Sequence, residues 1–168
     1  MTHPGRQFLA IFVAAFLTVP VVAAELPPGF VRLDEVAPTI RQEMRYAGAH
    51  NFVGRPIDGY KAADCWLLAA AAEALAAAAA GAKRFGWRLV VYDCYRPERA
   101  VADFAQWSKD PESQAMKAEF YPGIDKALLF EQGFIATRSQ HSRGTTVDIG
   151  AEALVDGVAR LGFQVNGG

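Results

Sequence analysis

A histidine and an aspartate stand on either side of a glycine-containing turn late in the sequence. They are His141 and Asp148, and the six residues between them include Gly144. A neutral imidazole and a carboxylate are both good ligands for a zinc ion. The turn would let His141 lie in a loop while Asp148 points from a strand into the same pocket. The same spacing also fits a solvated loop histidine and an unrelated carboxylate at the end of a strand.

An arginine follows the clearest predicted strand. Residues 87–94 are rich in β-branched and aromatic side chains, and Arg96 comes two residues later. A guanidinium held at a strand–helix junction offers a rigid fork of donors to a carboxylate or an oxyanion. In peptide hydrolysis it would stabilise the tetrahedral intermediate. Alternatively, Arg96 forms an ion pair with Asp93 or Glu98, or Asp93 supports a histidine ligand from behind.

The elements that must position these residues follow no regular βαβ rhythm. Residues 63–80 are almost all alanine and leucine and precede Gly81, which predicts a buried helix. Residues 145–149 alternate in polarity like a strand. Three further helices are expected, at residues 36–44, 100–108 and 111–120. The mixture predicts an α+β domain with a small, largely antiparallel sheet and flanking helices.

Composition limits the class of protein. The 168 residues are 52% hydrophobic and 21% charged, which fits one globular domain. The formal net charge is −1 and no basic cluster tracks along the chain. We therefore expect no nucleic-acid partner.

The first 24 residues have the pattern of a signal peptide. Arg6 precedes an apolar run over residues 8–22, and the small residues 23–24 provide a cleavage site. The alternative is an uncleaved membrane anchor, but the run is short for a span of about 20 residues and Pro20 interrupts it. We expect an exported, periplasmic protein without a stable membrane span, whose domain occupies residues 25–168.

Two cysteines, Cys65 and Cys94, lie beyond the signal peptide. In an oxidising compartment they could pair as a disulfide. The alternative is two buried free thiols. Metal binding is disfavoured because the two residues do not form a C-x-x-C spacing.

Three motifs, taken in order, resemble those of the zinc D-alanyl-D-alanine dipeptidase family of the vancomycin-resistance type. Ser139-x-His141-x-x-Gly144-x-x-x-Asp148 resembles the zinc signature of that family. Residues 91–97 resemble its arginine motif, and residues 51–60 resemble its N-terminal loop motif. The resemblance extends over residues 30–157 and implies a Hedgehog/DD-peptidase-like fold.

The resemblance implies a mononuclear zinc site with His-Asp-His ligands and a glutamate general base. It assigns His141 and Asp148 as ligands of Zn²⁺ and Arg96 as the group that stabilises the transition state. Ser139 and Tyr46 would line the substrate pocket, with Ser139 at the amino end of the substrate. The implied reaction is hydrolysis of the free dipeptide D-Ala-D-Ala by zinc-activated water.

The residues after Asp148 do not match the last signature of the family, Glu-x-x-Trp-His, which supplies the base and the third ligand. We therefore expect a domain that lacks its C-terminal part through truncation or a frameshift. His50 is considered as a replacement ligand, and Glu131, Glu152 or Asp156 as a replacement base, although no spacing recommends them.

Three functions remain open from the sequence. The first is an active zinc D-Ala-D-Ala dipeptidase, and the second is a non-catalytic remnant that at most binds D-Ala-D-Ala. The third is a related D,D-carboxypeptidase that acts on the stem peptides of the cell wall.

Overall fold

The computed structural model of the protein describes residues 27–155 and 158–165. The predicted signal peptide at residues 1–24 lies outside this part of the chain, as does Asp156. Within the described residues, no helix is long and apolar enough to cross a membrane.

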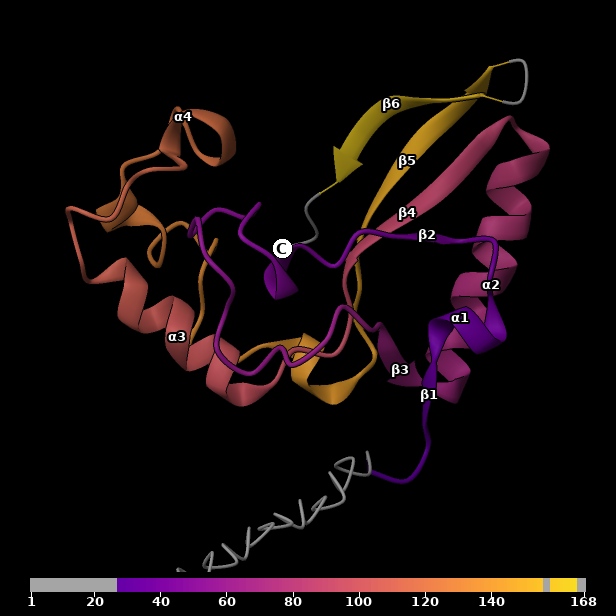
Figure 1. Ribbon diagram of the computed structural model, residues 1–168, viewed down its shortest axis with the longest axis horizontal. Coiled ribbons are helices and arrows are strands. Elements are labelled where there is room, and N and C mark those ends of the chain that lie inside the picture. Colours follow the sequence, from indigo (N-terminus) through magenta and orange to yellow (C-terminus); the bar gives the residue numbers. More distant parts are fainter. Residues whose placement is uncertain (1–26, 156–157, 166–168) are drawn as a thin grey trace, which may run out of the picture.

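Strand β4 (Trp87–Asp93) is the centre of the structure. Val90 and Val91 are fully buried, and such β-branched side chains favour a pleated strand. Strand β4 belongs to a four-stranded sheet (Figure 1), in the order β2 (Arg41–Gln42), β4, β5 (Asp148–Val155) and β6 (Val158–Val165). The pairs β4–β5 and β5–β6 are antiparallel, and β2 runs parallel to β4.

A second, two-stranded sheet lies beside the first. Strand β1 (Phe30–Arg32) pairs antiparallel with β3 (Trp66–Leu68). The fold is therefore mixed α+β with small open sheets, and the prediction of a largely antiparallel sheet with flanking helices is confirmed.

The helices lie on two sides of the strands. In Figure 1, α1 (Leu33–Val36) and α2 (Ala69–Arg84) lie to the right of β4, and α3 (Glu98–Ser108) and α4 (Lys117–Phe120) lie to the left. Each side has its own apolar cluster. One cluster includes Leu33, Leu67, Leu75, Val91 and both cysteines, and the other includes Val53, Ile57, Phe104, Trp107 and Tyr121. Val91 of β4 belongs to the first cluster, and Ile149 of β5 packs against it.

Helix α2 is shifted from its predicted position at residues 63–80. Residues 66–68 form β3 instead, because Leu67 is fully buried when it pairs opposite Val31. The helix also continues through Gly81 and ends before Gly86, whose φ of 77° is the left-handed conformation that closes many helices. The glycine that stops the helix is therefore Gly86 rather than Gly81.

Of the other predicted helices and strands, some are confirmed and some are wrong or shortened. The strand at residues 87–94 and the helix at 100–108 are confirmed as β4 and α3. The helix predicted at 36–44 is wrong, because Pro38 disfavours helical backbone at the preceding residue and the chain turns into β2. The helix predicted at 111–120 is reduced to α4, and the strand predicted from residue 145 begins at Asp148.

Replacement of Leu67 by alanine tests the role of β3 in the core. Because Leu67 is fully buried, Leu67→Ala should lower the free energy of unfolding by about 2–5 kcal/mol. Urea denaturation followed by circular dichroism measures this change. Leu128→Ala is the control, since the Leu128 side chain is 38% exposed, and equal losses in both variants would contradict the assignment of Leu67 to the core.

Candidate metal and substrate site

The segment that carries His141 is a short 3₁₀ helix, Gln140–Arg143, closed at both ends by side-chain and backbone constraints. Ser139 precedes the helix, and its Oγ accepts a hydrogen bond from the His141 amide at 3.3 Å. Gly144 ends the helix with a φ of 70°. A Cβ at Gly144 would lie 2.4 Å from the Phe30 ring, so only glycine fits there. The Ser-x-His-x-x-Gly pattern thus has a local structural cause.

The imidazole of His141 is buried and has a defined orientation. Its Nδ1 lies 2.9 Å from the carbonyl oxygen of Cys94. A carbonyl only accepts hydrogen bonds, so Nδ1 carries the proton and donates it. The other ring nitrogen, Nε2, lies 3.3 Å from Oδ1 of Asp148. The ring therefore presents Nε2 to that carboxylate.

A change of register brings two aspartates together at the end of the sheet. The pairing of β4 with β5 shifts between Val91 and Asp93, after which Asp93 lies opposite Asp148. One ligand atom from each of Asp93, His141 and Asp148 lies within 4.8 Å of the others. Among the described residues, the side chains of these three converge as those of metal ligands do.

Asp93 is fully buried, and both of its carboxylate oxygens have partners. Oδ1 accepts from the Tyr60 hydroxyl at 2.8 Å, and Oδ2 accepts from Nε of Arg96 at 2.9 Å. Burial raises the pKa of Asp93 to about 6, although the charge of Arg96 opposes this shift. Through these hydrogen bonds, Asp93 holds Tyr60 and Arg96 in place.

Arg96 is fixed by two carboxylates and two aromatic rings. In addition to the Asp93 contact, its Nη2 lies 3.2 Å from Oδ2 of Asp148. The guanidinium carbon lies 5.3 Å from the ring centroids of both Tyr46 and Phe104, which is within the range of a cation–π contact. The structure therefore brings Arg96, Asp148 and Tyr46 into one site.

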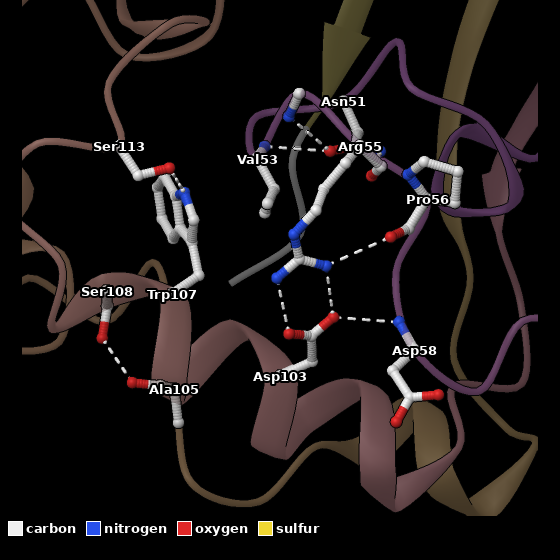
Figure 2. Close-up of polar contacts among 11 residues, drawn as sticks. Asn51, Val53, Arg55, Pro56, Asp58, Asp103, Ala105, Trp107, Ser108 and Ser113 are labelled. Carbon is white, nitrogen blue, oxygen red and sulfur yellow. Dashed lines mark hydrogen bonds and ion pairs between the residues drawn. The ribbon is translucent and has the colours of Figure 1, made fainter.

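The loop that leads to Tyr60 is pinned to α3, as Figure 2 shows. Arg55 donates two hydrogen bonds of 2.7 Å to the two carboxylate oxygens of Asp103. The Asp58 amide donates to the same carboxylate at 2.9 Å. Asn51 closes the beginning of the loop, since its Oδ1 accepts from the amides of Val53 and Gly54. Because the loop is anchored on α3, Tyr60 is held in position to donate its hydrogen bond to Asp93.

Cys65 and Cys94 are joined by a disulfide, and their Cα atoms lie 5.3 Å apart. Both residues are buried in the apolar cluster beneath α2. The bridge therefore connects the residue before β3 to the residue after β4.

Comparisons with known proteins agree with this arrangement. The profile of a family described as D-ala-D-ala dipeptidase matches residues 27–158. This chain belongs to the D-Ala-D-Ala dipeptidase family. The family resemblance inferred from the three motifs is thus confirmed.

The chain matches part of the length of several named relatives. The chain is 42% identical over 128 residues to the D-alanyl-D-alanine dipeptidase of Streptomyces coelicolor, which is 76% of this chain and 63% of that protein. It is 40% identical over 121 residues to that of Enterococcus faecalis and 34% identical over 119 residues to that of Escherichia coli. The matched regions span 60% and 51% of those two proteins.

The facing atoms of His141 and Asp148 fit a bound cation. With Nδ1 protonated, Nε2 of a neutral ring directs a lone pair at a carboxylate oxygen 3.3 Å away. That approach is repulsive unless a proton or a cation lies between the two atoms. Zinc bonds of about 2.0–2.1 Å in tetrahedral geometry place neighbouring ligand atoms about 3.3–3.4 Å apart. The 3.3 Å between His141 Nε2 and Asp148 Oδ1 matches this distance between neighbouring ligand atoms.

The replacement groups considered from the sequence lie in other contacts. The exposed His50 faces Glu119 at 2.6 Å, and it is absent from the convergent group among the described residues. Glu152 is buried and accepts from Arg41 and Arg88, which lower its pKa despite its burial. Glu131 is exposed. None of the three belongs to the group formed by Asp93, His141 and Asp148 among the described residues.

Sequence reasoning missed the part that Tyr60 plays. Its hydroxyl reaches Asp93 across 33 positions of the chain, and no local pattern reports such a contact. The available signal was the placement of Tyr60 at the end of the N-terminal loop motif. The sequence offers Asp93 as a partner of Arg96 or of a histidine ligand. The structure places it 2.9 Å from Arg96 and 3.5 Å from Nδ1 of His141.

Removal of the Tyr60 hydroxyl should destabilise the protein. Tyr60→Phe leaves the buried Asp93 without one of its donors, so the free energy of unfolding should fall by about 1–3 kcal/mol. Chemical denaturation measures the difference. Tyr95→Phe is the control because it leaves the Asp93 contacts intact, and a similar loss in that variant would argue against the specific role of Tyr60.

The contact between Arg55 and Asp103 should give stability a defined pH dependence. The hydrogen bonds from Arg55 hold the pKa of Asp103 below its ordinary value, so the ionised form stabilises the folded state. This contribution is complete above the unfolded pKa of about 3.9 and is lost as the pH falls through the lower folded pKa.

Unfolding free energies of the wild-type chain and of Asp103→Asn, measured between pH 7 and the acid limit of the fold, test this dependence. The difference between the two proteins should stay constant down to about pH 4 and narrow below it. A difference that grows as the pH falls would have the wrong sign.

Proposed function

We propose that the protein is a zinc metallodipeptidase that hydrolyses D-alanyl-D-alanine. The observation that carries the proposal is the 3.3 Å separation of His141 Nε2 and Asp148 Oδ1, with Arg96 beside the same carboxylate. A zinc ion held by these residues would polarise the scissile carbonyl and lower the pKa of a bound water. Because the chain spans about 60% of the length of the Streptomyces coelicolor and Enterococcus relatives, activity of the whole protein stands as a proposal.

His141 and Asp148 supply the metal-binding atoms in this proposal. The Cys94 carbonyl keeps the proton on Nδ1 of His141, which leaves Nε2 free to bind a cation. Asp148 uses Oδ2 for Arg96 and directs Oδ1 toward His141. Asp93 stands behind both groups and balances the charge of Arg96. The donor set therefore suits a divalent cation of zinc type.

Arg96 would stabilise negative charge on the substrate carbonyl oxygen. Its contacts with Asp93 and with the rings of Tyr46 and Phe104 hold the guanidinium in place before substrate arrives. A preorganised charge costs little reorganisation as the oxyanion develops, which is the usual source of such stabilisation.

Tyr46 and Ser139 would line the pocket for the dipeptide. Burial raises the pKa of Tyr46 above its ordinary value, so its hydroxyl stays protonated and remains a donor at neutral pH. The Ser139 Oγ accepts one bond from the His141 amide. A second lone pair on that oxygen can accept from the ammonium group of the substrate.

We also propose that the protein works outside the cytoplasm, as its signal-peptide pattern suggests. The Cys65–Cys94 disulfide supports this location, because such bonds persist in oxidising compartments such as a periplasm. Free D-Ala-D-Ala in that compartment would be the substrate.

Release of D-alanine from D-Ala-D-Ala by the purified chain with added zinc tests the function. Zinc-dependent release that is lost in His141→Ala is the expected result. Binding of the dipeptide without release would favour a non-catalytic binder. Release from a stem pentapeptide in preference to the free dipeptide would favour a D,D-carboxypeptidase.

Substitution of Arg96 by lysine separates positioning from charge. Lysine keeps the positive charge but loses the planar fork that contacts Asp93 and Asp148 together. We expect kcat to fall by about 10²–10³-fold with the zinc content unchanged. Steady-state D-alanine release and metal analysis measure the two quantities, and a lysine variant with wild-type kcat would contradict the role given to Arg96.

A further inference from the structure

Cys94 takes part in two connections at once. Its side chain forms the disulfide with Cys65, and its carbonyl oxygen accepts the Nδ1–H of His141 at 2.9 Å. It also lies directly after Asp93 and two residues before Arg96. A covalent cross-link therefore ends at the residue that orients a candidate metal ligand.

The chain at Cys94 has little sheet pairing of its own. The β4–β5 pairing ends with Asp93 opposite Asp148, so Cys94 lies beyond the last pair of the ladder. The next backbone tie is the Tyr95 amide, which donates to the Trp66 carbonyl at 3.0 Å. The disulfide reinforces the chain where the ladder stops.

The other end of the cross-link is firmly anchored. The Cys65 carbonyl accepts from the Leu33 amide at 3.0 Å, and Leu33 is fully buried. Cys65 precedes β3, whose Leu67 is also fully buried in the same apolar cluster. The disulfide thus ties the end of β4 covalently to this buried cluster.

We propose that the Cys65–Cys94 disulfide is a positioning element of the metal site, which fixes the Cys94 carbonyl and through it the Nδ1–H tautomer and orientation of His141. The proposal rests on the proposed function in assuming that His141 binds a metal ion. Loss of such a supporting contact typically lowers metal affinity by about 10–100-fold. The cysteines themselves touch neither metal nor substrate.

The test compares the metal affinity of the oxidised wild-type chain with that of a Cys65→Ser/Cys94→Ser double variant. Competition between the metal-free chain and a chelator for Co²⁺ measures the affinity, which should be about 10–100-fold weaker in the double variant. Leu75→Ala is the matched control, since Leu75 is in the same apolar cluster but forms no part of the cross-link. Equal affinities in the wild-type chain and the double variant would overturn the proposal, as would an equal loss in Leu75→Ala.

Reduction of the wild-type chain provides a second route if the double variant does not fold. A trialkylphosphine takes an oxygen atom from water and becomes its oxide, while the disulfide gains two electrons and two protons to form two thiols. The phosphine is removed before Co²⁺ is added. Reduction should weaken binding by the wild-type chain as much as the double substitution does, and it should leave the double variant unchanged.

A metal-free readout separates failure of this inference from failure of the proposed function. Nitrogen NMR of the imidazole should show a single Nδ1–H tautomer of His141 in the oxidised chain and a mixture of tautomers without the disulfide. If no form of the chain binds Co²⁺, the proposed function fails and the tautomer measurement still decides the inference. An unchanged tautomer in the reduced chain would overturn it.

Discussion

The buried carboxylate of Asp93 is the constraint on which the site depends. An ionised group in a fully buried position is stable only where hydrogen bonds and an opposite charge replace water. Here Tyr60 supplies a hydroxyl and Arg96 supplies a guanidinium. The burial of Asp93 therefore requires Arg96 beside it. Arg96 is also the residue that would stabilise the oxyanion in the proposed reaction.

Three segments distant in the sequence meet at this carboxylate. The N-terminal loop brings Tyr60, and its position follows from the contact of Arg55 with Asp103 on α3. The end of β4 brings Arg96, and the 3₁₀ helix around His141 packs against the same strand end through the Cys94 carbonyl. Each of the three motifs recognised in the sequence thus contributes a residue to this group of contacts.

The sequence predicted the elements whose signal is local. Strand β4 is rich in β-branched and aromatic residues, helix α3 follows Pro97, and both formed close to their predicted bounds. Trp66-Leu67-Leu68 could equally begin a helix, and only pairing with β1 makes it a strand. The Tyr60–Asp93 contact and the register shift that sets Asp93 opposite Asp148 are tertiary features without a local pattern. Within the site, residue types were therefore predictable and their anchoring was not.

Zinc titration into the metal-free chain tests whether His141 and Asp148 form a zinc site. Isothermal calorimetry of the wild-type chain, His141→Ala and Asp148→Asn gives the stoichiometry and affinity at the facing pair 3.3 Å apart. We predict one zinc ion per wild-type chain and strongly weakened binding in both variants. Undiminished zinc binding in either variant, or a wild-type chain that binds no zinc, would contradict this prediction.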